Sequence, residues 1–295
     1  MLTRCVMVMA LALMGPAACG GGDDASGDEA GGSPRSLEIV ATDPSRDAVE
    51  LRAPRTIEAG VTEIVLTNRG DALHDAQLLK VDGDRTAEDL VDDLLEAVDS
   101  VAKPGWAHPM GGVAALRPGE SRAVVQVLEP GRYLIADTQE RPTGKAFKAT
   151  NALKGGIVEL EVTGDGGGTL PRPPGGASVT ATDDGFETES VVAGVDRAVR
   201  FENAGKEWHQ AVFFRVPKGE SYEQAGRRLF DRRRDTGWVP VDVPAAQATA
   251  VLEGGGAQLV DLSLERGKYL IACFVSDRAG GASHFATTLS GFEVR

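Results

Sequence analysis

LEPGRYLIA at residues 128–136 and LERGKYLIA at residues 264–272 are two versions of one segment, identical at seven of nine positions. In both, a Gly is followed by Tyr and a short apolar run, which predicts a buried strand entered through a turn. NRGDALH at 68–74 and NAGKEWH at 203–209 share Asn, Gly and His at the same spacing. The two pairs are offset by almost the same number of residues, so an internal duplication explains both.

Each copy predicts several short strands and one helix. The strands are marked by alternating apolar residues and by Gly-rich turns. Thr86 with Asp89 predicts the start of a helix in the first copy, and Ser221 with Gln224 does so in the second. The fold class predicted is all-β, with two Greek-key β-sandwich domains that each carry a short helical insertion.

Composition shifts divide the chain into five parts. Gly, Ser and acidic residues follow the N-terminal apolar stretch, and GDGGGTLPRPPGG separates the two copies. The predicted organisation is a signal peptide at 1–19, a flexible tether at 20–35, domain 1 at 36–163, a Gly/Pro linker at 164–176 and domain 2 at 177–295.

The first nineteen residues, MLTRCVMVMALALMGPAAC, have one Arg, an apolar run and small residues before Cys19. This pattern is typical of a secretory signal, and the run is too short to serve as a bilayer-spanning anchor. The junction around Cys19 resembles the lipobox of bacterial lipoproteins. The resemblance implies that Cys19 is acylated and tethers the protein to the extracytoplasmic face of a bacterial membrane. Simple secretion after an Ala-x-Ala-like cleavage site is the alternative.

Charge and motif content exclude several function classes. A net charge of −13 argues against binding to nucleic acid, which needs Lys and Arg at the phosphates. We find no Gly-x-Ser-x-Gly elbow, no P-loop and no His-Glu-x-x-His helix, and therefore predict that the chain is not an enzyme. Cys273 is the one thiol expected in the mature protein, because Cys5 and Cys19 belong to the signal peptide and the lipid junction.

One constellation in the second copy carries metal-binding chemistry. His209 follows the Asn-Gly turn, Cys273 follows the Gly-x-Tyr strand, and His284 precedes the last strand. This order resembles the cupredoxins, over residues 36–163 and 177–295. The resemblance implies a copper site of two imidazoles and one thiolate, with Leu289 at the axial position that a weak Met ligand usually fills.

The first copy lacks this set. His74 matches His209, but Asp137 stands at the Cys position and no second His follows. We therefore predict a degenerate site at His74 and Asp137. His108 and Met110 could offer weak copper ligands, although a structural role in a loop is the simpler interpretation.

Two functional interpretations stay open. One is a membrane-anchored extracytoplasmic binding or scaffold protein without a well-formed copper site, because ten residues separate Cys273 from His284 and Leu289 replaces the axial Met. The alternative is a copper-binding electron-transfer or copper-handling protein that uses domain 2. No cofactor is certain on these grounds. The membrane is the partner expected, and a protein partner is left unspecified.

Overall fold

The computed structural model describes residues 34–96, 104–139, 150–236, 248–276 and 283–295. Residues 34–295 form one compact unit. The predicted signal peptide, Cys19 and most of the tether lie outside the described residues. No helix in the described part has the length and apolar character needed to cross a membrane.

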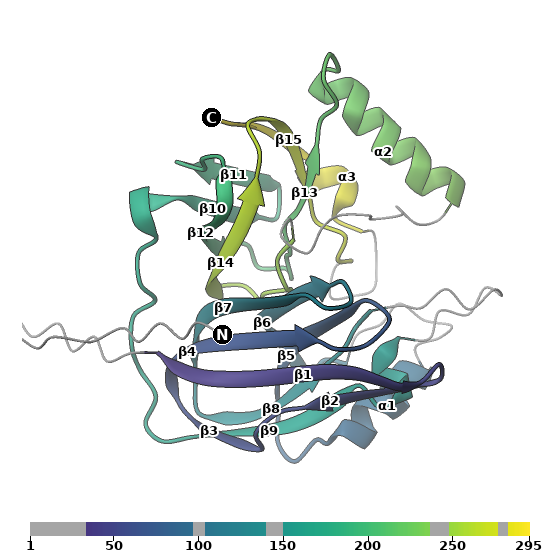
Figure 1. The fold of residues 1–295 in the computed structure, drawn as a ribbon, viewed down its shortest axis with the longest axis vertical. Coiled ribbons are helices and arrows are strands. Elements are labelled where there is room, and N and C mark those ends of the chain that lie inside the picture. The colour runs from purple at the N-terminus through teal and green to yellow at the C-terminus, as the bar shows by residue number, and fades with distance from the viewer. Residues whose placement is uncertain (1–33, 97–103, 140–149, 237–247, 277–282) are drawn as a thin grey trace, which may run out of the picture. The chain divides into compact units, whose positions relative to one another are not determined.

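Most of the described chain is arranged in three sheets (Figure 1). The eight-stranded sheet has the spatial order β11 (Gly185–Glu189), β10 (Ser178–Thr182), β12 (Gly194–Asn203), β14 (Ala257–Leu264), β7 (Ser121–Leu128), β4 (Gly60–Asn68), β1 (Arg35–Ser45), β2 (Ala48–Arg52). The five-stranded sheet has the order β3 (Thr56–Glu58), β9 (Ile157–Thr163), β8 (Gly131–Ala136), β5 (His74–Val81), β6 (Ala107–Leu116). The three-stranded sheet has the order β13 (Val212–Arg215), β15 (Gly267–Ala272), β16 (Ser290–Val294). The all-β prediction is confirmed.

Alternating burial explains how these sheets stack. In β4, Thr62, Ile64 and Leu66 are fully buried, while the residues between them are partly or fully exposed. Side chains of successive residues point to opposite faces of a strand, so one face of each sheet is apolar. A single continuous core joins the eight-stranded sheet to the other two, with members such as Leu66, Ile135, Phe201 and Ile271.

The two sequence copies contribute to the same large sheet. β14 of the second copy pairs antiparallel with β7 of the first, with Val260 opposite Val124. Figure 1 shows β14 running down to β7 at this junction. Within the predicted linker at 164–176, Leu170 is buried. The domain division at that linker stays a prediction, and the eight-stranded sheet contains strands of both copies.

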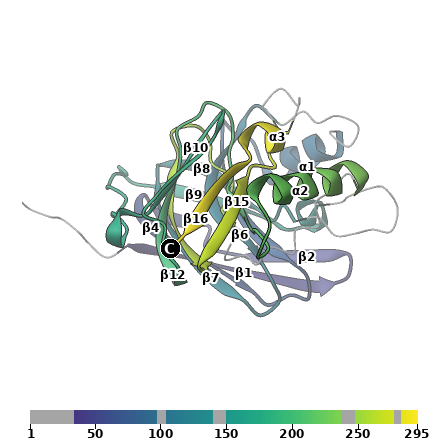
Figure 2. The same ribbon diagram turned by 90° about the horizontal axis from the view of Figure 1, so that it is seen from above.

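The helices are short and lie outside the sheets. They are α1 (Ala87–Glu96), α2 (Tyr222–Thr236), α3 (Phe285–Thr288) and the 3-10 turns η2 (Asn151–Lys154) and η3 (Pro174–Gly176). Thr86 and Asp89 exchange hydrogen bonds at the start of α1, and Ser221 and Gln224 do so at the start of α2. α2 lies beside α3 and β15 in both views (Figure 1 and Figure 2), and its Leu229 packs in one cluster with Phe285.

Candidate metal centre

His209 lies in the turn after β12, and its side chain is fully buried. Asn203 Nδ2 donates to the backbone oxygens of Glu207 and Leu252, both at 2.8 Å, and its Oδ1 accepts from the Gly205 N–H at 2.9 Å. A Cβ at Gly205 would lie 2.4 Å from Asp183 Oδ1 and 3.1 Å from His209 Nε2. Glycine is needed there because a carboxylate approaches the imidazole across its backbone.

The three predicted ligands converge. One ligand atom from each of His209, Cys273 and His284 lies within 4.8 Å of the other two. Cys273 Sγ is 3.9 Å from His284 Nδ1, and the two imidazole rings have centroids 4.9 Å apart. His209 and Cys273 are fully buried, whereas His284 is partly exposed. The donors come from the turn after β12, the end of β15 and the residue before α3.

The two ring nitrogens of His209 have different surroundings. Its Nε2 lies 3.2 Å from Asp183 Oδ1, so the proton of the neutral ring belongs on Nε2. Its Nδ1 is buried and has no hydrogen-bond partner among the described residues. Burial lowers the pKa of His209 despite the raising effect of Asp183, and nearby His284 lowers it further. A neutral imidazole with an unused buried lone pair is suited to binding a metal.

Thr288 joins the two remaining ligands. The Cys273 N–H donates to Thr288 Oγ1 at 3.1 Å, and that hydroxyl donates to the His284 carbonyl at 2.7 Å. The Thr288 N–H also donates to the His284 carbonyl, at 2.9 Å. The backbones of Cys273 and His284 are therefore fixed to each other by one fully buried side chain.

The long segment between Cys273 and His284 is closed at its base. Ser276 and Ser283 form an antiparallel bridge, and the His284 N–H donates to the Val275 carbonyl at 3.0 Å. These contacts hold His284 beside the strand that carries Cys273, whatever the length of chain between the two serines. Separation in sequence therefore does not loosen this ligand pair.

Two residues near the three candidate ligands bear on the predicted axial position. Leu289 packs toward α2, where a Cβ at Gly226 would lie 3.0 Å from its Cδ2. The Trp208 carbonyl oxygen lies 3.9 Å from Cys273 Sγ. A backbone oxygen can serve as the long axial donor in sites of two His and one Cys. The assignment of Leu289 to the axial position stays a prediction.

The corresponding place in the first copy is filled by a polar cluster. His74 Nδ1 lies 2.5 Å from Asp137 Oδ2, and His74 Nε2 lies 3.1 Å from Asp43 Oδ2. Asn151 Nδ2 donates to Asp137 Oδ2 at 3.0 Å and to the Leu73 carbonyl at 3.0 Å. His74, Asp137 and Asn151 are fully buried. Hydrogen bonds thus join the side chains where the second copy brings His209, Cys273 and His284 together.

A further carboxyl group lies against this cluster. Asp75 accepts hydrogen bonds from the N–H and hydroxyl of Thr138 and from the Gln139 amide. Burial, together with repulsion from Asp137, raises the pKa of Asp75 to about 7, although these hydrogen bonds lower it.

Two residues of the sites that share one sequence motif were not predicted from the sequence. Asp43 and Asp183 each end an Ala-Thr-Asp triplet, at 41–43 and 181–183, and each faces the Nε2 of the His after the Asn-Gly turn. The repetition of this triplet was the available signal. Thr288 and Asn151 have no such counterpart in the other copy, and only the structure shows their roles.

His108 and Met110 do not meet the three ligands. His108 Nδ1 lies 3.2 Å from Glu253 Oε2, and its Nε2 lies 3.1 Å from Asp82 Oδ2. Met110 forms an antiparallel bridge with Leu252. Both residues therefore contact the second copy through 252–253, and the described residues hold no metal-ligand group around His108.

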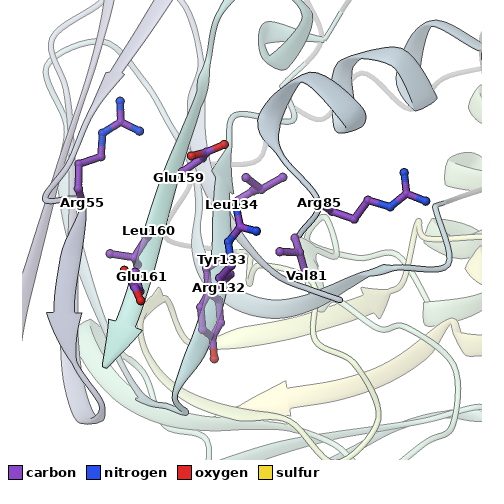
Figure 3. Close-up of a pocket in the computed structure, with 9 residues that line it drawn as sticks. All are labelled: Arg55, Val81, Arg85, Arg132, Tyr133, Leu134, Glu159, Leu160 and Glu161. Atoms are coloured by element: carbon purple, nitrogen blue, oxygen red, sulfur yellow. The ribbon is translucent and has the colours of Figure 1, made fainter. Parts of the chain in front are cut away.

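A pocket of about 270 Å³ lies elsewhere, in the five-stranded sheet next to α1 (Figure 3). Arg55 and Arg85 lie on its two sides, and Glu159 and Glu161 also line it. Arg85 is paired with Asp89, and Glu159 accepts from the Ala87 N–H at 3.3 Å. The mixed charges of this pocket are partly satisfied by the protein itself, and none of its lining residues belongs to the metal centre.

Comparison with known proteins gave matches among solved structures alone. No family model matches the chain, and no curated protein matches it. Among solved structures, reduced auracyanin from Roseiflexus castenholzii aligns at 18% identity and TM-score 0.30, covering 45% of this chain and 100% of that one. A multicopper oxidase aligns at 15% identity and TM-score 0.25, covering 88% of this chain and 89% of that one. A copper-containing nitrite reductase from Thermus scotoductus aligns at 10% identity and TM-score 0.21, covering 88% and 61%.

The prediction that the chain is not an enzyme is corrected by this comparison. Two of the similar structures, the multicopper oxidase and the nitrite reductase, are enzymes by name. The missing hydrolase, P-loop and zinc-helix motifs were therefore too narrow a basis for the exclusion. None of these alignments assigns a reaction or a ligand to this chain.

Proposed function

We propose that this chain is a copper-binding protein of two tandem cupredoxin-like Greek-key domains, 36–163 and 177–295, and that it transfers electrons or handles copper through the second. His209, Cys273 and His284 would hold the metal. Their convergence within 4.8 Å is the observation that carries the proposal. It favours the copper interpretation over a scaffold without a copper site.

The donor set has the chemistry that copper requires. Thiolate binds Cu(I) strongly and imidazole suits both oxidation states, so a bound copper would supply one-electron exchange at this site. The protein contributes the rest: Asp183 keeps the His209 proton on Nε2, and Thr288 fixes the Cys273 and His284 backbones together. This matches the outer-shell support that orients metal ligands in proteins.

Copper loading of the full mature chain tests the proposal. We expect about one copper per chain to survive dialysis and to give intense thiolate-to-copper absorption, because one site of two His and one Cys is preformed. Cys273→Ser should remove the band, since it removes the thiolate. The melting temperature should rise with copper, as linkage requires of a ligand that binds the folded state.

A paired variant controls for copper bound elsewhere. His108→Gln with Met110→Leu should leave both the stoichiometry and the band unchanged, because neither side chain reaches the three ligands. The scaffold interpretation would be restored by a different result. In that case a mild chelator would remove all copper from the wild-type chain, no absorption band would appear, and the melting temperature would not respond to copper.

We also propose that the protein is exported and held at the membrane by a lipid on Cys19. The small residues before Cys19 and the acidic, Gly-rich segment after it support this placement. The wild-type protein should partition into detergent, and Cys19→Ser should remove both the partitioning and the mass of the acyl groups. Release of the unmodified wild-type protein in buffer alone would favour simple secretion.

A further inference from the structure

The backbone of His209 is hydrogen-bonded to Leu252, and the segment around Leu252 also contacts strand β6 of the first copy. The His209 N–H donates to the Leu252 carbonyl at 3.0 Å, and the Leu252 N–H donates to the His209 carbonyl at 2.8 Å. Leu252 is buried and also bridges Met110 of β6. Leu252 therefore lies between the metal ligand and a strand of the degenerate copy.

The neighbours of Leu252 complete this attachment. The Gly111 N–H donates to the Val251 carbonyl at 2.9 Å, and the Glu253 N–H donates to the Pro109 carbonyl at 2.7 Å. The segment 251–253 is thus fixed to β6 through its flanking residues and to His209 through its centre. A shift of β6 relative to the second copy would move the backbone of His209 with it.

One side chain of the first copy forms hydrogen bonds with this segment directly. Gln77, on β5, accepts from the Val251 N–H at 2.9 Å and has its Nε2 3.0 Å from the Val251 carbonyl. The same Nε2 lies 2.9 Å from the Gly111 carbonyl. Gln77 is 5% exposed, so these bonds form away from water. Its carboxamide bonds both the N–H and the carbonyl of Val251, as the backbone of a neighbouring strand would.

The two copies differ at this position. Gln77 lies three residues after His74, and Val212 lies three residues after His209. Val212 is buried and apolar, as expected for a strand residue that faces a core. A buried amide at position 77 is explained by its contact with the second copy, because both its polar atoms bond to Val251.

We propose that Gln77 is a positioning residue for the copper site: through Val251 and Leu252 it fixes the backbone of His209, so the degenerate copy sets the geometry of the metal bound by the other. This inference rests on the proposed copper function. It gives the first copy a role in that function although its own site has lost the Cys and the second His.

The test compares Gln77→Met with Gln258→Leu in the full mature chain. Met keeps an unbranched side chain of similar volume but bonds neither polar atom of Val251. Gln258 is a fully buried amide near the same junction, and its Oε1 accepts from the Gly112 N–H at 3.2 Å rather than from 251–253. Both substitutions should lower the melting temperature, because each leaves buried backbone polar groups with fewer partners.

The readouts of the metal site should separate the two variants. With Gln77→Met we expect copper affinity to fall about tenfold, at the low end of the range for outer-shell changes, and the thiolate-to-copper absorption to shift. In the copper-free protein, hydrogen exchange of the His209 and Leu252 amides should become at least about tenfold faster, because local opening costs less. Gln258→Leu should change none of these.

The outcomes distinguish this inference from the proposed function. Failure of the wild-type chain to retain copper would overturn the copper proposal and this role with it. Normal copper binding by the wild type, with absorption, affinity and amide exchange unchanged in Gln77→Met, would overturn only the positioning role. A lower melting temperature alone, equal to that of Gln258→Leu, would show that Gln77 merely stabilises the junction.

Discussion

In the copper-free protein, replacing His74 with Ala is expected to lower the free energy of unfolding by about 3–5 kcal/mol. The ring nitrogens of His74 face Asp137, which is fully buried, and Asp43, whose side chain is 6% exposed. Removing the imidazole takes one hydrogen-bond partner from the fully buried Asp137 side chain, in a place where water cannot replace the lost bond. Chemical denaturation of the wild type and the variant measures the difference.

The matched control is His209→Ala. His209 occupies the same turn and is equally buried, but its carboxylate partner Asp183 is 41% exposed and can be rehydrated. We expect a smaller loss, of about 1–2 kcal/mol, because the carboxyl group that loses its partner is open to water. Equal losses in the two variants would show that the cavity left by the ring, rather than the lost partner of Asp137, sets the decrease in the free energy of unfolding.

A second large effect is expected from rebuilding the lost site. Asp137→Cys combined with Asn151→His should raise the copper content from about one to about two per chain and roughly double the thiolate-to-copper absorption. His74 Nδ1 lies 2.5 Å from Asp137 Oδ2 and 3.4 Å from Asn151 Nδ2, so the three side chains already meet. Metal analysis and absorption of the double variant give the answer.

Asn151→His alone is the control for this rebuilding. It supplies a second imidazole but no thiolate, and should give no additional absorption band. Retention of one copper by the double variant, with the spectrum of the wild type, would show that the polar surroundings of the first site, including Asp75 and Asp43, prevent a copper centre even when the ligands are present.

The sequence was most informative where a residue is needed for a local reason. Gly205 recurs as Gly70 because a side chain at either position would collide with the Asp that approaches the His. Asn203 recurs as Asn68 because its amide bonds two backbone groups within the turn, an N–H two residues on and a carbonyl four residues on. Such short-range requirements leave a fixed spacing, and that spacing revealed both the repeat and the candidate ligands.

The loop before His284 shows where spacing misled. Ten intervening residues predicted a loosely held ligand, yet the bridge between Ser276 and Ser283 returns the chain to the strand of Cys273. Contacts between residues far apart in sequence, such as Thr288 with Cys273, depend on side chains whose meeting no local pattern records. Loop length therefore measures the freedom of a ligand only when the ends of the loop are not joined.

By itself the sequence determined the all-β class, the duplicated segments and the identity of three candidate ligands, because alternation, turn residues and metal-binding side chains are properties of short stretches of chain. The tertiary structure alone decided that these candidate ligands converge, that two carboxyl groups contact the ring nitrogens of His74 in the first copy, and that β7 and β14 join both copies in one sheet. Those outcomes depend on strand pairing between distant segments and on which buried polar groups find partners, and both are fixed only when the whole core is assembled.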